Sequence, residues 1–152
     1  MAIVVTSTSF PPNGPIPKKH TGEGSDISPS LSWSGLPPET KEIAIICDDP
    51  DAPTPEPWVH WVLYKVPPVP NGIAEGSNGG GVEGRNSWST IGWRGPMPPK
   101  GHGVHHYHFR VFALDAPVEY SPGITKNELL QRMRGHVLAE GELIGTYERR
   151  NE

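Results

Sequence analysis

The stretch Asp49-Pro50-Asp51-Ala52-Pro53, with Trp58-Val59-His60-Trp61 after it, decides the expected fold. A strongly apolar run, Ile43-Ala44-Ile45-Ile46-Cys47, precedes the acidic turn, and a second apolar run follows it. Two such runs joined by a turn predict two neighbouring strands, and the prolines stiffen the turn because they fix φ. The two aspartates and the histidine then lie at strand ends, where they either form a small polar pocket or face water.

Length and composition predict a single domain spanning residues 1–152, long enough for a core without disulfides or metals. The chain has 18 glycines and 19 prolines, which lie between apolar runs and therefore favour many short strands over disorder. The net charge of −4 excludes the basic surface that a nucleic-acid partner needs.

The single cysteine, Cys47, is typical of a protein from a reducing compartment. Residues 1–6 carry no positively charged segment and only a short apolar run, so they do not resemble a signal peptide. No run approaches the roughly 18 apolar residues of a membrane-spanning helix. We therefore expect a cytoplasmic protein without a membrane span.

Apolar patterning predicts several strands and one helix. The expected strands cover residues 3–5, 31–34, 42–47 and 58–66, the longest one within 103–115, and a final one at 142–148. Thr125 and Glu128 match a capping box that begins a helix, which Gly135 ends, whereas residues 136–139 are ambiguous. This pattern predicts an all-β fold, an antiparallel β-sandwich with a minor C-terminal helix.

Strand alternation also assigns side chains to faces. In the segment 103–115, one face is expected to carry His105, Tyr107, Phe109, Val111 and Ala113. The opposite face would then carry His106, His108, Arg110, Phe112 and Leu114. In the strand 58–66, the same rule places together Trp58, His60, Val62 and Tyr64. Each strand thus presents an aromatic residue and a histidine on one face near its start.

Three kinds of site fit poorly. Residues 79–84 match G-x-G-x-x-G formally, but no strand precedes them and no helix follows, so a loop is favoured over a nucleotide site. Four histidines cluster at positions 102, 105, 106 and 108, yet nothing nearby completes a tetrahedral set, so we expect no metal. There is no G-x-S-x-G elbow, and a thiol within an apolar strand stays protonated. Asp49 or Asp51 with His60 could form an acid–base pair, but no nucleophile accompanies it, so we expect no enzyme and no cofactor.

A pocket for an anion fits better. Histidine and tyrosine can donate to phosphate or carboxylate oxygens, and Trp58 and Pro99 would supply apolar walls. An aspartate would repel an anion, so Asp49 is expected either to pair with His60 and orient its ring by one of its nitrogens, or to have a raised pKa. The alternative is that Asp49, His60 and Tyr107 only satisfy one another and fix the end of the sandwich.

Several stretches resemble the phosphatidylethanolamine-binding protein family, in particular its prokaryotic Raf-kinase-inhibitor-like branch (the YbhB/YbcL type). The first is the opening stretch, residues 49–53 and 58–61. The second is Gly95-Pro96-Met97-Pro98-Pro99 followed by Gly103-Val104-His105-His106-Tyr107-His108-Phe109. The stretches 27–33, 135–139 and 145–147 are typical of the prokaryotic branch, so the resemblance spans nearly the whole chain.

The resemblance implies a sandwich with a small anion-binding cavity at one end. The residues that match the cavity lining of relatives are Asp49, Trp58, His60, Pro99, His105 and Tyr107. Family members bind phosphate, carboxylates, phospholipid head groups or phosphorylated residues there, are generally considered non-enzymatic, and in prokaryotes are often homodimers. Some inhibit kinases or serine proteases, so inhibition through surface loops is the alternative function.

Three positions depart from the family pattern. Met97 stands where the prokaryotic branch usually has cysteine, Trp93 where it often has tyrosine, and Ser30 where proline is common. The C-terminal segment that packs beside the cavity in the eukaryotic branch has no clear counterpart. The cavity is therefore expected, whereas its rim and the preferred partner are left open, and kinase inhibition does not carry over with the resemblance.

Overall fold

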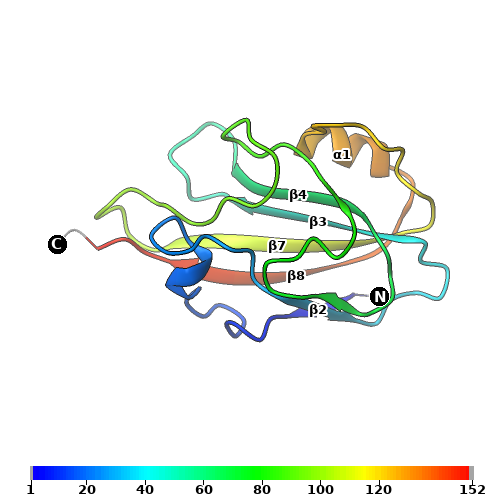
Figure 1. The fold of residues 1–152 in the computed structure, drawn as a ribbon, viewed down its shortest axis with the longest axis horizontal. Helices are drawn as coiled ribbons and strands as arrows, with labels where there is room; N and C mark the ends of the chain where they lie inside the picture. Colours follow the sequence, from blue (N-terminus) through cyan, green and yellow to red (C-terminus); the bar gives the residue numbers. More distant parts are fainter. Residues whose placement is uncertain (1, 151–152) are drawn as a thin grey trace.

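Two antiparallel sheets and one helix make up the computed structural model, which describes residues 2–150. The smaller sheet has the order β1-β2-β5, with β1 Val4–Thr6, β2 Leu31–Ser34 and β5 Gly72–Ile73. The larger has the order β6-β4-β3-β7-β8, with β6 Val82–Glu83, β4 Trp58–Val66, β3 Glu42–Asp49, β7 His105–Leu114 and β8 Val137–Tyr147. A short 3₁₀ helix covers Lys18–His20, and α1 covers Lys126–Met133. The predicted all-β sandwich with a minor C-terminal helix is confirmed (Figure 1).

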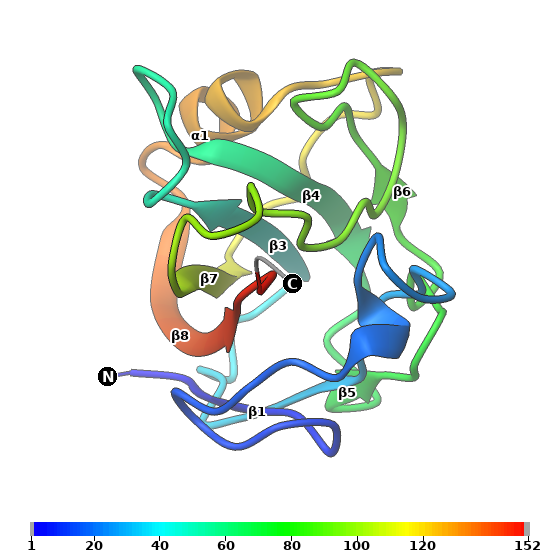
Figure 2. The same ribbon diagram turned by 90° about the vertical axis from the view of Figure 1, so that its left-hand side faces the viewer.

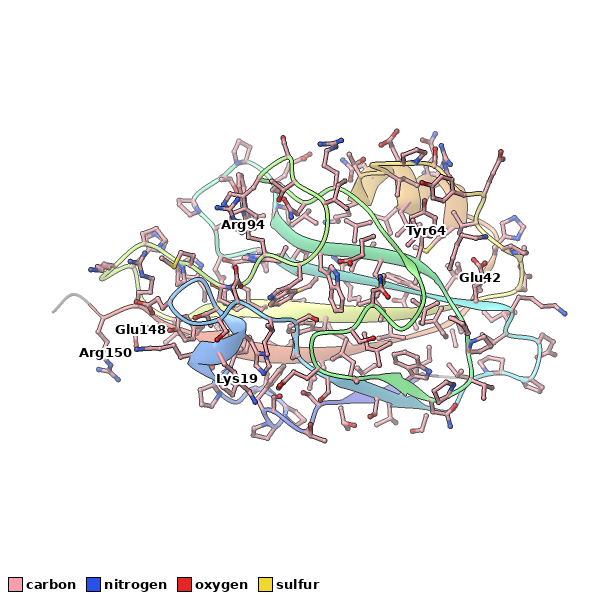
Figure 3. All side chains as sticks on the ribbon, in the orientation of Figure 1. Lys19, Glu42, Tyr64, Arg94, Glu148 and Arg150 are labelled. Carbon is pink, nitrogen blue, oxygen red and sulfur yellow. The ribbon has the colours of Figure 1, made fainter. Side chains whose placement is uncertain are left out.

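The larger sheet is buried on both faces, because the small sheet covers one face and α1 lies over the other (Figure 2). Between the sheets, the core contains Ile43, Ile45, Trp61, Phe109 and Leu31. Under the helix, the core contains Ala44, Ile46, Val62, Tyr64 and Leu129. Tyr64 lies on the side that faces α1 (Figure 3). Burial on both faces explains why β3 and β4 are continuous apolar runs rather than alternating ones.

A β-bulge in β4 overturns one predicted face. Cys47 pairs with Trp61 and Asp48 with Val59, so His60 is an extra residue on its strand. A bulge of this kind shifts the alternation by one position. Val59 therefore packs on the helix side with Val62 and Tyr64, whereas Trp58 and His60 turn toward the opposite side. The prediction that Trp58 and His60 share a face is confirmed, but their predicted grouping with Val62 and Tyr64 is wrong.

The C-terminal elements differ from the sequence prediction in one respect. The capping box is present, since the Thr125 hydroxyl accepts from Glu128 N–H and the Glu128 carboxylate accepts from Thr125 N–H. The ambiguous residues 136–139, however, belong mostly to β8, which at 11 residues is longer than β7 with 10. Gly141 sits in the middle of β8, where a side chain would collide with the Ile3 backbone crossing over it. A glycine inside a strand thus allows a close chain crossing.

Two further predictions concern the glycine-rich residues 79–84 and membrane-spanning helices. Within the glycine-rich residues 79–84, Gly79 and Gly80 form a turn and Val82–Glu83 form β6, and no helix directly follows, which argues against a nucleotide-binding motif. Among residues 2–150, no helix is both long enough and apolar enough to cross a membrane.

Candidate functional site

A pocket of about 240 Å³ opens where β3 ends and where β4 and β7 begin. These three strand ends meet because neighbouring strands run antiparallel. The lining contains all six predicted residues: Asp49, Trp58, His60, Pro99, His105 and Tyr107. It also contains Ala52, Pro53, Thr54, Trp88, Met97 and Pro98, which were not among the predicted lining residues. The volume lies below the roughly 300–1,000 Å³ of typical small-molecule sites, so the pocket suits a small group.

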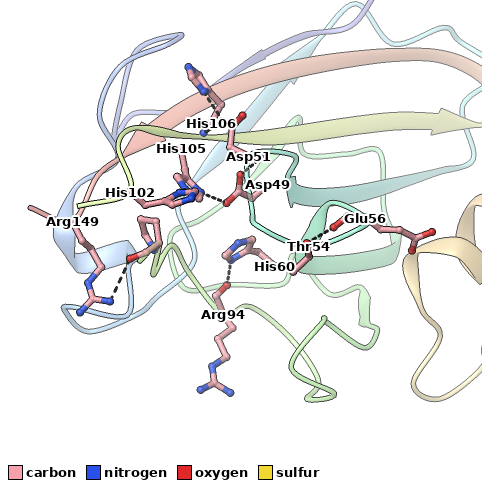
Figure 4. A network of polar contacts seen from close by, with 11 residues as sticks. Asp49, Asp51, Thr54, Glu56, His60, Arg94, His102, His105, His106 and Arg149 are labelled. Atoms are coloured by element: carbon pink, nitrogen blue, oxygen red, sulfur yellow. Dashed lines mark hydrogen bonds and ion pairs between the residues drawn. The ribbon is translucent and has the colours of Figure 1, made fainter. Parts of the chain in front are cut away.

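Asp49 orients a different histidine from the one predicted. Its Oδ2 accepts from Nδ1–H of His105 at 2.6 Å, with both side chains buried (Figure 4). His105 Nε2 in turn lies 2.7 Å from Nδ1 of the exposed His102, so the three side chains form a hydrogen-bonded chain from the pocket to the surface. The predicted Asp49–His60 pair is therefore wrong. Asp49 lies on β3 and His105 on the neighbouring strand β7. Because Asp48 pairs with His108 in this antiparallel pair, the end of β3 lies beside the start of β7, and the side chains of Asp49 and His105 come together.

The acidic turn is fastened at two points. Asp49 Oδ1 accepts from the Asp51 N–H at 2.8 Å, which closes the turn locally. Asp51 Oδ2 accepts from both N–H and Nδ1–H of His106, each at 2.8 Å, which ties the turn to β7. Together with Pro50 and Pro53, these bonds hold the turn in place before any ligand arrives.

His60 is held by backbone instead of a carboxylate. Its Nδ1–H donates to the Arg94 carbonyl oxygen at 2.6 Å, while the Arg94 side chain points away (Figure 4). Burial lowers the pKa of His60 to about 4, against the opposing effects of the Arg94 hydrogen bond and of Asp49. The ring is therefore neutral near pH 7, and Nε2 carries the lone pair.

This burial predicts a specific acid sensitivity. A histidine with a folded pKa near 4 and an ordinary value of 6.5 binds more protons when unfolded, so the free energy of unfolding falls as pH drops from 6.5 toward 4. Wild type is expected to lose about 2 kcal/mol more than His60→Asn between pH 7 and 4.5. The asparagine amide can still donate to the Arg94 carbonyl but does not titrate. Urea denaturation of both proteins at the two pH values measures the difference, and equal losses would contradict the buried neutral ring.

Tyr107 places a hydroxyl group without a partner at the pocket. The residue is 1% exposed, and its hydroxyl oxygen makes no hydrogen bond to any of the described residues. Burial and the nearby Asp49 charge raise the pKa of Tyr107 well above its ordinary value, so the O–H remains protonated. The alternative in which Asp49, His60 and Tyr107 satisfy one another is therefore wrong, since each of the first two bonds elsewhere and the third bonds to nothing.

Aromatic rings form much of the wall. The Trp88 ring meets Trp58 edge to face at 5.5 Å and His60 at 5.0 Å, and the Arg94 guanidinium lies 4.9 Å above Trp88. Trp88 comes from the loop between β6 and β7, whose irregular sequence carries no periodicity. A tryptophan within a glycine-rich loop was the only available signal that this segment returns to the site.

The three departures from the family pattern fall in different places. Met97 lines the pocket and is 42% exposed, so it alters the rim. Trp93 instead packs into the core between the sheets, where it stacks on Phe109 at 5.9 Å. Ser30 shares a hydrogen bond of 2.7 Å with Thr8 at the surface. Only the first of the three changes what a ligand would touch.

The described residues give little support for a reactive cysteine or for a metal site. Cys47 is fully buried, and burial raises the pKa of its thiol well above the ordinary value. His106 and His108 pair with Asp51 and Glu142, and no group of three His, Cys, Asp or Glu side chains within residues 2–150 is placed to hold a metal ion. Among the described residues that line the pocket there is also no lysine or arginine.

Comparison with known proteins assigns the chain and its fold to a family. Residues 6–148 match the family model described as phosphatidylethanolamine-binding protein. A UPF0098 protein of Methanothermobacter thermautotrophicus is 46% identical over 147 residues, which cover 93% of this chain and 95% of the relative. The crystal structure of a phosphatidylethanolamine-binding protein homologue from Chlamydia trachomatis superimposes with a TM-score of 0.92 at 41% identity, covering 97% and 98% of the two chains. Escherichia coli YbcL superimposes with a TM-score of 0.90 at 31% identity, covering 97% and 99%. The chain therefore belongs to the phosphatidylethanolamine-binding protein family.

Proposed function

We propose that this protein is a non-enzymatic binding protein whose pocket takes a small anionic group, a phosphate, phosphoryl or carboxylate group. The group would belong to a phospholipid head group, a phosphorylated residue or a small metabolite. The observation that carries the proposal is the buried Tyr107 hydroxyl, which has no partner among residues 2–150. A buried polar group without a partner is costly, so a ligand oxygen that accepts from it is favoured.

The surroundings support binding rather than catalysis. The turn 49–53 and the His60 ring are fixed by hydrogen bonds, so little ordering is required when a ligand enters. Asp49 and His105 resemble an acid–base pair, but His105 Nε2 faces His102 instead of a nucleophile. Thr54 lines the same pocket, and its hydroxyl donates to the Glu56 carbonyl oxygen. We therefore propose that no residue of the pocket acts as a nucleophile.

Calorimetric titration with inorganic phosphate and with O-phosphoserine tests the proposal. Saturable binding to one site is expected, and His60→Ala should abolish it while the protein stays folded in a thermal melt. His136→Ala is the matched control, because this histidine is exposed, pairs with Asp115 and does not line the pocket. If the wild-type protein binds neither phosphate nor O-phosphoserine, the anion pocket is refuted.

The alternative function, inhibition of a kinase or serine protease through surface loops, needs a separate test. The loop between β6 and β7 is its candidate surface, but Trp88 of that loop also walls the pocket. Ile91, which is exposed on the same loop, is therefore the better position. If an assay of target enzymes finds inhibition that Ile91→Asp removes while phosphate binding survives, the loop-based function replaces the pocket-based one.

A further inference from the structure

The pocket has a buried floor and a more exposed rim. Asp49, His60 and Tyr107 line the floor, and their exposed fractions are 3%, 3% and 1%. Residues 97–99 form the rim, where Met97 is 42% exposed. An anionic group small enough to reach the floor therefore leaves the atoms that carry it beside the rim.

The rim belongs to no strand or helix, so contacts from other segments have to hold it. Prolines at positions 96, 98 and 99 have no N–H, and this part of the chain can be fastened mainly through its carbonyl oxygens. Before the rim, the Pro96 carbonyl oxygen accepts from Gly22 N–H at 3.0 Å. Within the rim, the Pro98 carbonyl oxygen accepts from Arg149 Nη1–H at 3.3 Å (Figure 4). After the rim, Gly101 N–H donates to the Arg149 carbonyl oxygen at 3.0 Å. Arg149 thus holds this loop with both its side chain and its backbone.

Glu23 holds the Arg149 side chain in place. Glu23 Oε2 lies 3.4 Å from Arg149 Nε, and Glu23 Oε1 accepts from the Tyr147 hydroxyl at 2.6 Å. The Arg149 and Glu23 side chains are 19% and 27% exposed, so water screens this ion pair only in part. These contacts join segments that lie far apart in the sequence, and they orient Arg149 before any ligand arrives.

We infer that Arg149 is a positioning residue of the pocket, which fixes the rim and thereby favours an anionic group attached to a carrier over the free anion. This inference rests on the proposed anion-binding function and adds the part that the rim plays in it. Arg149 does not line the pocket, and its effect passes through Pro98, which does. A rim that is already ordered loses less conformational entropy when a carrier packs against it.

Amide hydrogen exchange of the free protein tests the hold on the rim. Arg149→Met keeps a long side chain but removes the N–H donors. Exchange at Gly22 and Gly101 is expected to become at least about 5-fold faster, because the loop opens more easily. Arg150→Met is the matched control, since Arg150 is exposed and does not line the pocket, and it should leave both rates unchanged. Wild-type exchange rates in Arg149→Met, or equal acceleration in both variants, would overturn the inference.

Calorimetric titration with inorganic phosphate and O-phosphoserine tests the effect on binding. In Arg149→Met, the affinity for O-phosphoserine is expected to fall by about 3- to 10-fold, and that for inorganic phosphate by less than about 2-fold. A general loss of structure would weaken both ligands alike, so the ratio of the two affinities reports on the rim. A thermal melt establishes that the variant is folded at the temperature of the titration.

The outcomes separate this inference from the proposed function. If Arg149→Met binds both ligands as wild type does, or weakens both by the same factor, the role of Arg149 in selectivity is overturned and the anion pocket stands. If wild type binds neither ligand, the anion pocket and the inference are both overturned.

Discussion

Replacing Tyr107 with phenylalanine is expected to weaken phosphate binding by about 10- to 100-fold, because a hydrogen bond to a charged group contributes about 1.5–3 kcal/mol. The same change should leave the free energy of unfolding unchanged or raise it by up to about 1 kcal/mol. The hydroxyl has no partner to lose among residues 2–150 of the free protein, and its burial is a cost that phenylalanine removes. We therefore expect the Tyr107 hydroxyl to strengthen phosphate binding while it lowers the folding stability of the free protein.

Tyr64→Phe removes the same hydroxyl group, but here we expect a loss of folding stability and no loss of phosphate affinity. The Tyr64 hydroxyl donates to the Ser121 carbonyl oxygen and accepts from the Ser121 N–H, both at 2.9 Å, on the helix side of the sheet. Its removal should lower the free energy of unfolding by about 1–3 kcal/mol and leave phosphate affinity intact. Calorimetric titration and urea denaturation of the two variants measure both quantities. If both variants lose stability alike and both keep their affinity, Tyr107 is a core residue and not a ligand contact.

Replacing Asp48 with alanine is expected to cost about 3 kcal/mol of folding stability, in the range found when one member of a buried ion pair is removed. Asp48 Oδ2 accepts from Arg110 at 2.6 Å and from Lys126 at 2.7 Å, and its side chain is only 4% exposed. Lys126 is the first residue of α1, so the carboxylate also ties the helix to β3. Its loss leaves two partly buried cations facing each other.

The expected effect of Asp48→Ala on binding is nil, even though the next residue lines the pocket. Successive side chains of β3 point to opposite faces, so Asp48 faces the helix and Asp49 faces the pocket. Asp115→Ala, which breaks only an exposed pair with His136, should change stability by less than about 0.5 kcal/mol. Urea denaturation gives the stabilities, and phosphate titration gives the affinities. Lost binding with unchanged stability in Asp48→Ala would show that the faces are assigned the wrong way round.

Much of the fold could be predicted from local patterns. β2 and β4 have the predicted bounds, and the capping box places the start of α1 correctly. These features depend on residues close together in the chain, which is where periodicity and capping carry information. β8 was only partly predicted, because the reason for Gly141 is a contact with Ile3, more than a hundred residues away.

The residues of the site could be predicted more fully than the bonds between them. All six residues that the family resemblance implied line one pocket; five of them lie near strand ends, and Pro99 lies in the loop before β7. The partner of Asp49 could not be predicted, because the choice between His60 and His105 depends on the bulge in β4 and on the position of the Arg94 carbonyl. Trp88 was missed for a related reason: an irregular loop has no period that indicates where it returns.

The bulge at His60 also determines which changes of chain length the protein can accommodate. A substitution between Trp58 and Trp61 alters one side chain, and the neighbouring side chains stay on the faces of the sheet that they already occupy. A deletion or insertion there exchanges the inner and outer side chains of the strand end, so a tryptophan or histidine of the pocket would move to the helix face. Residues 55–57 lie outside the paired strands, are exposed and do not line the pocket, so the turn can vary more freely in length there. Within a few residues, the chain thus passes from a segment that tolerates insertions and deletions to one that tolerates only substitutions.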